Sequence, residues 1–166
     1  IALMKDGVIV QIGTPEEILI QPADRYVERF VEDVDLSKVL TAAHVMRAPE
    51  TIAPERGPRV ALQLMRDSGV SSLYVTGKEK KLLGVLTADD ASEALKANKT
   101  IEAVMHTDVP IVSPETHLNE LFEMMAETKL PVAVVDDQGK LRGIIIKGAV
   151  LSALAGNAVP EAGEAG

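Results

Sequence analysis

The residues whose types and spacing best suit binding chemistry are Gly84, Thr87 and Asp90, in the motif Gly84-x-x-Thr87-x-x-Asp90. A strand that ends at Thr87 would place its hydroxyl beside the N-terminus of the following helix, where free N–H groups favour anions. The carboxylate of Asp90 would follow one turn later. A ribose diol can hydrogen-bond to this carboxylate, and a phosphate can meet the hydroxyl and the N–H groups. Gly84 would let the strand lie close to a neighbouring segment or to a ligand.

Ordinary helix capping explains the same residues. Threonine is a favoured N-cap residue, and an acidic side chain three residues later commonly bonds back to the cap. The pattern of Thr87 and Asp90 therefore indicates either a cap alone or a cap that also serves a nucleotide site. Both interpretations stay open on the local sequence.

Other kinds of chemistry have little support. The chain has no cysteine, which excludes disulfides, thiol nucleophiles and cysteine metal sites. The histidines lack the spacing of metal ligands, and no G-x-S-x-G motif marks a nucleophilic serine. We therefore expect no metal site, no catalytic residue and no enzymatic activity. The histidines are His44, His106 and His117.

The charge distribution limits the partners. A formal net charge of −8 argues against nucleic acid, which needs a positive protein surface. Basic residues gather in two places, which fit solvated faces or, alternatively, contacts with phosphate or anionic lipid that salt would weaken. They are Arg47, Arg56, Arg59, Arg66, Lys78, Lys80 and Lys81. No apolar run approaches the roughly 20 residues that a membrane-spanning helix needs.

An internal repeat must position the motif. Val45-Met46 recurs as Val104-Met105 and Gly84 recurs as Gly143, both at one separation (104 − 45 = 143 − 84 = 59). One offset that holds across a lead-in segment and a strand indicates two copies of one half-domain. Because aromatic residues make up only 2% of the chain, aliphatic side chains must build both cores.

Hydrophobic periodicity predicts the same order of elements in both copies: strand, helix, strand, strand, helix. Threonines at 41 and 100 each precede a short predicted helix, over 42–46 and 101–105. The ranges of the first copy are 51–53, 58–68, 73–75, 82–87 and 88–97. Those of the second copy are 110–112, 115–128, 132–135, 141–146 and 147–155.

The first residues differ from the repeats. Asp6-Gly7 between two apolar runs predicts a β-hairpin over 1–12. A capping pattern at Thr14 predicts a helix over 15–20, and a second helix is expected over about 24–32. This opening resembles the end of an ABC-transporter ATPase domain, in the run Ile1 to Leu19, in Pro22 and in Tyr26-Val27. It lacks the phosphate-binding loop of such ATPases. We expect the chain to be a piece of a longer protein.

The doubled half-domain resembles the CBS domain pair. The matching strings are Gly84 to Asp90 in the first copy, and Leu130 to Asp136 with Gly143 to Ile145 in the second. The resemblance implies an α+β fold of two β-α-β-β-α repeats packed about a pseudo-twofold axis, after a short β-hairpin and helix remnant of an ABC ATPase domain. The implied divisions are 1–32 for this remnant, 33–41 for a linker, 42–98 and 99–155 for the CBS repeats, and 156–166 for a disordered tail.

The resemblance also implies a ligand. In CBS families that bind adenine nucleotides, the residues that match Thr87 and Asp90 hold the phosphate and the ribose. The adenine would lie against the backbone near Ile52-Ala53 and Ser72-Leu73, and Gly84 belongs to the same site as the first residue of the motif. The expected cofactor is an adenine nucleotide: AMP, ATP or cyclic di-AMP.

The second copy departs from this pattern. Ile146 and Ala149 stand at the positions that match Thr87 and Asp90, although Lys147 lies beside them. A second, equivalent ribose site is therefore not expected, and the module is asymmetric unless a dinucleotide binds at a dimer interface.

An ATPase-like end followed by a CBS-like pair resembles the C-terminal part of ATP-binding subunits of glycine betaine/L-proline transporters. This family implies a regulatory module that senses an adenine nucleotide or ionic strength and gates the ABC ATPase domain of the same chain, through residues 33–41, during osmolyte uptake. It also implies a homodimer through the CBS pair, a membrane permease subunit as partner, and a cytoplasmic place at the inner face of the cell membrane. The alternative is a ligand-free structural dimerisation module of the same subunit.

Overall fold

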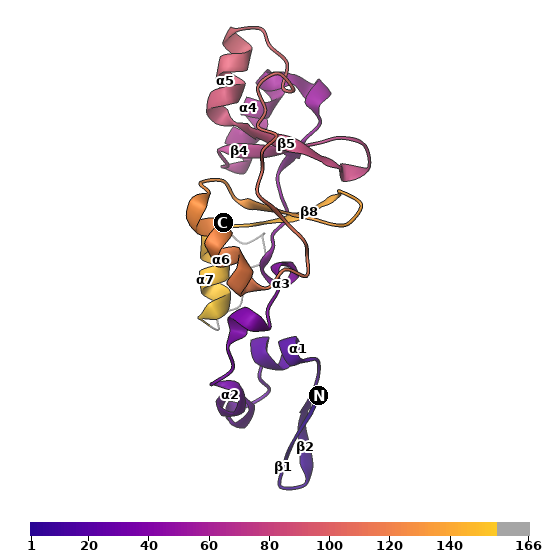
Figure 1. Ribbon diagram of the computed structural model, residues 1–166, viewed down its shortest axis with the longest axis vertical. Coiled ribbons are helices and arrows are strands. Elements are labelled where there is room, and N and C mark those ends of the chain that lie inside the picture. The colour runs from indigo at the N-terminus through magenta and orange to yellow at the C-terminus, as the bar shows by residue number, and fades with distance from the viewer. Residues whose placement is uncertain (156–166) are drawn as a thin grey trace.

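The structure, a computed structural model, describes residues 1–155, so the predicted disordered tail lies outside the described residues. Figure 1 shows an elongated molecule with a β-hairpin at one end, the second repeat in the middle and the first repeat at the far end. Within the described part of the chain, every helix is too short or too polar to span a membrane.

The N-terminal segment forms the predicted hairpin and two short helices. The hairpin strands pair antiparallel, and the turn residues Asp6 and Gly7 both have positive φ, 51° and 81°. Such angles match the twist of a two-residue hairpin. Thr14 caps the first helix in a capping box, as predicted, and Asp24 caps the second. The elements are β1 (Ala2–Lys5), β2 (Val8–Ile12), α1 (Pro15–Ile20) and α2 (Arg25–Val31).

The first repeat is a three-stranded sheet with two longer helices, preceded by one short helix. β3 pairs parallel with β4, and β4 pairs antiparallel with β5. The first of the two longer helices ends at Gly69, whose φ of 66° is the left-handed C-cap that glycine favours. The elements are α3 (Ala42–Val45), β3 (Thr51–Ile52), α4 (Gly57–Ser68), β4 (Ser72–Thr76), β5 (Leu82–Thr87) and α5 (Ala88–Lys96).

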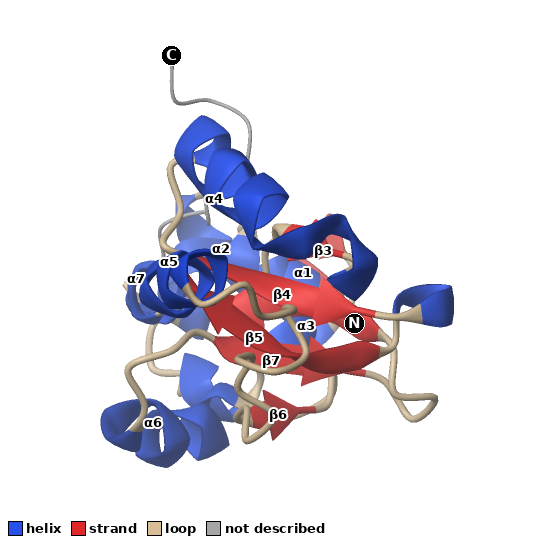
Figure 2. Ribbon diagram, turned by 90° about the horizontal axis from the view of Figure 1, so that it is seen from above, coloured by secondary structure: helices blue, strands red, loops and turns tan. Residues whose placement is uncertain are grey.

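The second repeat has the same topology. β6 pairs parallel with β7, and β7 antiparallel with β8. The elements are β6 (Ile111–Val112), α6 (Leu118–Glu127), β7 (Val132–Val135), β8 (Leu141–Ile145) and α7 (Lys147–Leu154). Seen from above in Figure 2, α5, α6 and α7 gather on one side of the stacked strands. The predicted α+β fold of two repeats is confirmed.

Two predicted helices differ from the structure. The helix predicted over 115–128 begins only at Leu118, because residues 113–116 form a turn in which the Ser113 carbonyl accepts from the Thr116 amide. The helix predicted over 101–105 is wrong: this segment is a single turn, closed by a bond from the Met105 amide to the Ile101 carbonyl. The next residue, His106, pairs with Val85 on β5 through its backbone, so the chain is extended there and the helix cannot continue.

The two sheets pack against each other across the seam between the repeats. Tyr74 stands at the centre of this packing, and its hydroxyl donates a 2.7 Å hydrogen bond to the Pro131 carbonyl of the second repeat. Ala133, at the matching position of the second repeat, has no hydroxyl with which to return the bond. The seam is therefore asymmetric. Its buried side chains are Tyr74, Val85, Val109, Ala133 and Leu141.

The lead-in segment of each repeat pairs with the last strand of the other repeat. These lead-in segments are 42–47 in the first repeat and 101–106 in the second. Arg47 pairs with Ile144 on β8, and His106 pairs with Val85 on β5. Side chains cross over in the same way: Val45 packs into the core of the second repeat, and Ile101 packs into the core of the first. The two halves are thus tied together by backbone hydrogen bonds as well as by the seam.

Candidate functional site

The candidate site begins where β5 becomes α5. Thr87 has an extended backbone and is the N-cap of α5, and its hydroxyl accepts a 3.2 Å bond from the Asp90 amide. The Asp90 carboxylate returns the contact by accepting from the Thr87 amide and hydroxyl. The two residues form a complete capping box, so capping is confirmed as one role of the pair.

A third side chain joins them from the other repeat. The Nε2 atom of His106 lies 2.9 Å from Oδ2 of Asp90. The carboxylate side chain is 24% exposed and the imidazole 52% exposed, so the contact lies at the surface of the seam. The lead-in of the second repeat therefore supplies a residue to the motif of the first.

The Asp90 carboxyl is held in its ionised form. Its partial burial opposes ionisation, but the hydrogen bonds from Thr87 and His106 outweigh burial and lower the pKa of Asp90 below its usual value. At neutral pH the site therefore offers a carboxylate that accepts hydrogen bonds. This is the group that a ribose diol requires.

The structure brings some of the predicted site residues together and separates others. Ser72 lies directly opposite Thr87 in the β4–β5 register, while Ile52 lies opposite Val75, three residues further along β4. At about 3.3 Å a residue, this offset is roughly 10 Å. Leu73 is fully buried, and Ala53 is exposed beyond the end of β3. Ser72 thus belongs with Thr87 and Asp90, whereas Ile52 and Ala53 stand apart.

Gly84 allows the lead-in segment of the second repeat to approach β5 closely. A Cβ atom on Gly84 would lie 2.5 Å from the backbone oxygen of His106. A side chain at this position would therefore push the lead-in away from β5. The close approach that the sequence indicated is thus made by a neighbouring segment of the chain.

The second repeat has a different set of groups at the matching place. Ile146 begins α7 without any side-chain cap, and Ala149 is fully buried. Arg47 takes the place of His106, because both are the lead-in residues paired with the last strand of a repeat. Its Nε is buried and has no hydrogen-bond partner among residues 1–155. The asymmetry seen in the sequence is thus present in the fold.

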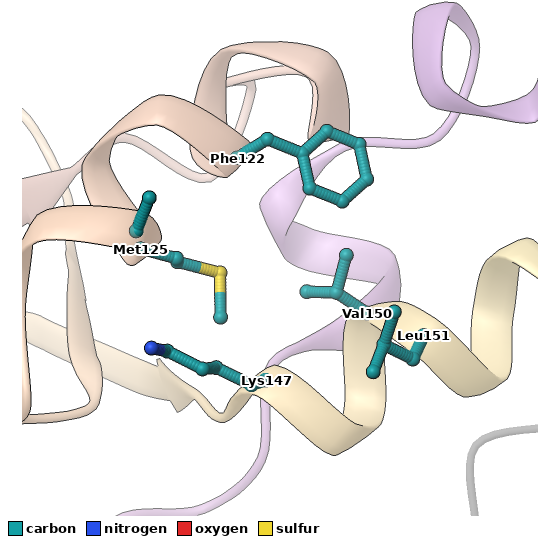
Figure 3. Close-up of a pocket in the computed structure, with 6 residues that line it drawn as sticks. Phe122, Met125, Lys147, Val150 and Leu151 are labelled. Carbon is teal, nitrogen blue, oxygen red and sulfur yellow. The ribbon is translucent and has the colours of Figure 1, made fainter.

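A groove lies beside the helices of the first repeat, and an apolar hollow lies between those of the second. A groove of about 590 Å³ beside α4 and α5 is lined by Arg59 and Arg66 among apolar residues, and it reaches Ser71 and Ala88, the neighbours of Ser72 and Thr87. A smaller apolar hollow of about 180 Å³ lies between α6 and α7 (Figure 3). Its lining residues are Phe122, Met125, Ala126, Lys147, Val150 and Leu151.

His106 is the site residue that sequence reasoning missed. The spacing of the histidines bears only on metal ligation and gives no reason to pair His106 with Asp90. The described residues contain no cluster of three groups that could hold a metal ion. The signal that could have found His106 was the repeat itself, since His106 matches Arg47 at the 59-residue offset (106 − 47 = 59). The contact with Asp90 needed the exchanged lead-in, which no local pattern indicates.

Comparison with known proteins identifies the fold. Residues 42–97 and 101–156 each match the model of the CBS domain. The chain is 52% identical over 157 residues to the glycine betaine transport ATP-binding protein OpuAA of Bacillus subtilis, and 49% identical over 161 residues to the glycine betaine/carnitine transport ATP-binding protein GbuA of Listeria monocytogenes. These matches cover 95% and 96% of this chain but 38% and 40% of the relatives. The chain thus spans about two-fifths of the length of these relatives.

Solved structures agree. Staphylococcus aureus OpuCA superposes with a TM-score of 0.63 at 27% identity, over 67% of this chain and 96% of that chain. CBSX2 in complex with AMP superposes with a TM-score of 0.61 at 26% identity, over 69% of this chain and 96% of that chain.

Proposed function

The chain belongs to the CBS-domain family, as a tandem pair, and from this premise we propose that it is the regulatory module of a glycine betaine transport ATP-binding subunit. In this proposal the module binds an adenine nucleotide at Thr87 and Asp90 and passes the signal to an ATPase domain of the same protein. The support for the transporter is the similarity to OpuAA and GbuA. ATP hydrolysis and transport belong to the rest of such a protein.

The observation that carries the nucleotide site is the ionised carboxylate of Asp90 beside the α5 N-terminus. Asp90 can accept the ribose hydroxyls. At the α5 N-terminus the Ala88 amide donates to the Ser71 carbonyl and the Asp90 amide donates to the Thr87 hydroxyl, so a phosphate would meet the Asp89 amide beside Thr87. Ser72, opposite Thr87, lies at the same edge of the sheet. The similarity to CBSX2, described in complex with AMP, supports an adenine nucleotide as the ligand class.

Ligand titration tests this site. We expect AMP, ATP or cyclic di-AMP to bind the purified chain in isothermal titration calorimetry, and Asp90→Asn to weaken binding by about tenfold or more, the worth of a charged hydrogen bond. Asp89→Asn is the matched control, because Asp89 is the exposed neighbour in the same helical turn. Equal losses in both variants, or none in Asp90→Asn, would reject the assignment.

The signal would travel through the linker that precedes the first repeat. Leu36 packs against the core of the second repeat, and the Leu40 carbonyl accepts a 3.0 Å bond from the Leu118 amide at the start of α6. A shift of the second repeat would therefore move residues 33–41 and the N-terminal segment with them. A ligand that favours one arrangement of the repeats would bias the ATPase through this connection. Nucleotide-dependent hydrogen exchange at Leu118 would report the coupling.

A second candidate function is a dimerisation scaffold without ligand. The α6–α7 surface is apolar, and its residues Phe122 and Leu151 are 39% and 64% exposed (Figure 3). A second copy of the chain could cover this surface and bury the leucine. Sedimentation analysis of Leu151→Lys tests it: a dimer that persists unchanged rules out this face. A dimer lost in Leu151→Lys, with no nucleotide bound by either protein, would favour the scaffold.

A further inference from the structure

The second repeat's lead-in places an imidazole where a ribose would bind, and this inference rests on the nucleotide function proposed above. We propose that His106 is a gate that determines the specificity of the Thr87–Asp90 site. Its imidazole hydrogen-bonds to the carboxylate of Asp90. It turns away only for a ligand whose ribose hydroxyls replace this hydrogen bond.

One oxygen of the carboxylate is fully engaged. Oδ2 of Asp90 accepts from the Thr87 hydroxyl, from the Thr87 amide at 3.4 Å and from Nε2 of His106 at 2.9 Å. A ribose diol binds a carboxylate best when each hydroxyl donates to a separate oxygen. The Thr87 contacts belong to the helix cap, so the His106 imidazole is the partner that can leave.

The imidazole can leave without unfolding the seam. The His106 backbone is held by two 2.8 Å bonds with Val85, one in each direction, and these do not involve the ring. Gly84 provides the space for the His106 carbonyl. The ring is half exposed, so rotation of the side chain alone can move it into solvent, on the fast timescale of surface rotamers.

The gate distinguishes ligands by their sugar. Displacing His106 from Asp90 is compensated only by donors that reach the carboxylate, which are the 2′ and 3′ hydroxyls of a ribonucleotide. A nucleotide without these hydroxyls would leave His106 in place. Arg47 stands at the matching position of the second repeat, where Ala149 replaces the aspartate, so no carboxylate is present there for a similar gate.

The test compares AMP with 2′,3′-dideoxyadenosine monophosphate in calorimetric titrations of the whole chain. His106→Ala removes the competitor, so we expect AMP to bind about tenfold more tightly to this variant than to the wild type, while the dideoxy analogue gains nothing. His117→Ala is the matched control, since His117 is a similarly exposed histidine that stands at the N-cap position of α6 and lies 3.7 Å from the Glu120 carboxylate. An AMP affinity that is unchanged or weaker in His106→Ala overturns the gate.

A second measurement separates the gate from the nucleotide function. In NMR spectra of the wild type, saturating AMP should shift the His106 ring signals as Asp90→Asn does without ligand. AMP that binds while these signals stay in place overturns the gate and leaves the nucleotide site standing. AMP that binds only to His106→Ala supports the gate and shows that the wild-type site is closed. AMP that binds to neither protein overturns the gate, and the nucleotide site falls with it if ATP and cyclic di-AMP also bind to neither protein.

Discussion

The Tyr74 hydroxyl donates a 2.7 Å hydrogen bond to the carbonyl of Pro131, 57 residues further along the chain. This bond crosses the seam between the repeats from a side chain that is 2% exposed. Removing the Tyr74 hydroxyl therefore tests how much this bond contributes to holding the two repeats together.

Tyr74→Phe should destabilise the chain by about 1 to 2 kcal/mol, because it removes the donor and leaves a partly buried carbonyl unpaired. Equilibrium urea unfolding measures the loss. Tyr26→Phe is the control, since the hydroxyl of Tyr26 makes only a long, exposed contact of 3.4 Å. Equal stability of Tyr74→Phe and wild type would mean that water satisfies Pro131 and that the bond does not hold the seam.

The Tyr74 ring also predicts a response to alkaline pH. Burial raises the pKa of Tyr74 above its usual value, so the folded chain keeps this proton while the unfolded chain loses it above about pH 10. Ionisation of Tyr74 should therefore leave the free energy of unfolding unchanged below this pH and lower it as the pH rises beyond it. Urea unfolding at several alkaline pH values should show a shallower fall in Tyr74→Phe. Parallel curves for the two proteins would contradict the burial argument.

Gly84→Ala and Gly143→Ala form a matched pair at the two exchanged lead-ins. The added Cβ at position 84 would meet backbone oxygen at 2.5 Å, whereas at position 143 it would meet the Met46 side chain at 2.9 Å. At position 84 the backbone cannot move without breaking its pairing with β5. At position 143 the Cγ and Sδ atoms of Met46 can turn away, and the Cβ atom of Met46, at 2.9 Å rather than 2.5 Å, requires a smaller shift of its backbone. We expect Gly84→Ala to cost about 3 kcal/mol or more and Gly143→Ala clearly less, by urea unfolding. A larger loss at Gly143 would contradict this.

Thr87→Ala should remove the side-chain cap of α5 and cost about 1 kcal/mol in thermal or urea unfolding. Thr107→Ala is the control, because Thr107 is exposed and lies outside the helices. Should the two variants lose the same stability, the capping box would not contribute as its geometry indicates.

Asp90 predicts a dependence on acidic pH. Its pKa is lowered in the folded chain, so its contribution to stability is present above the unfolded pKa of about 4 and is lost as the pH falls through the lower folded value. Asp90→Asn removes this dependence. Wild type should therefore lose its advantage over Asp90→Asn between about pH 5 and pH 3, as measured by urea unfolding. A constant difference across this range would show that the carboxylate is not stabilised in the fold.

The sequence by itself determined the features that depend on neighbouring residues. The hairpin at Asp6-Gly7, the cap at Thr87 and the order of strands and helices in both repeats follow from local turn chemistry and hydrophobic periodicity, which each segment carries independently. The recurrence at 59 residues added the duplication, and the resemblance to the CBS domain pair added the fold class.

Only the tertiary structure decided which groups meet. The exchange of lead-ins places His106 on Asp90 and puts the His106 backbone against Gly84, and the parallel register of β3 moves Ile52 away from Thr87. These contacts join segments far apart in the chain and depend on how one sheet is laid on the other. Local propensity acts over a few residues, so it cannot specify which repeat a lead-in will pair with.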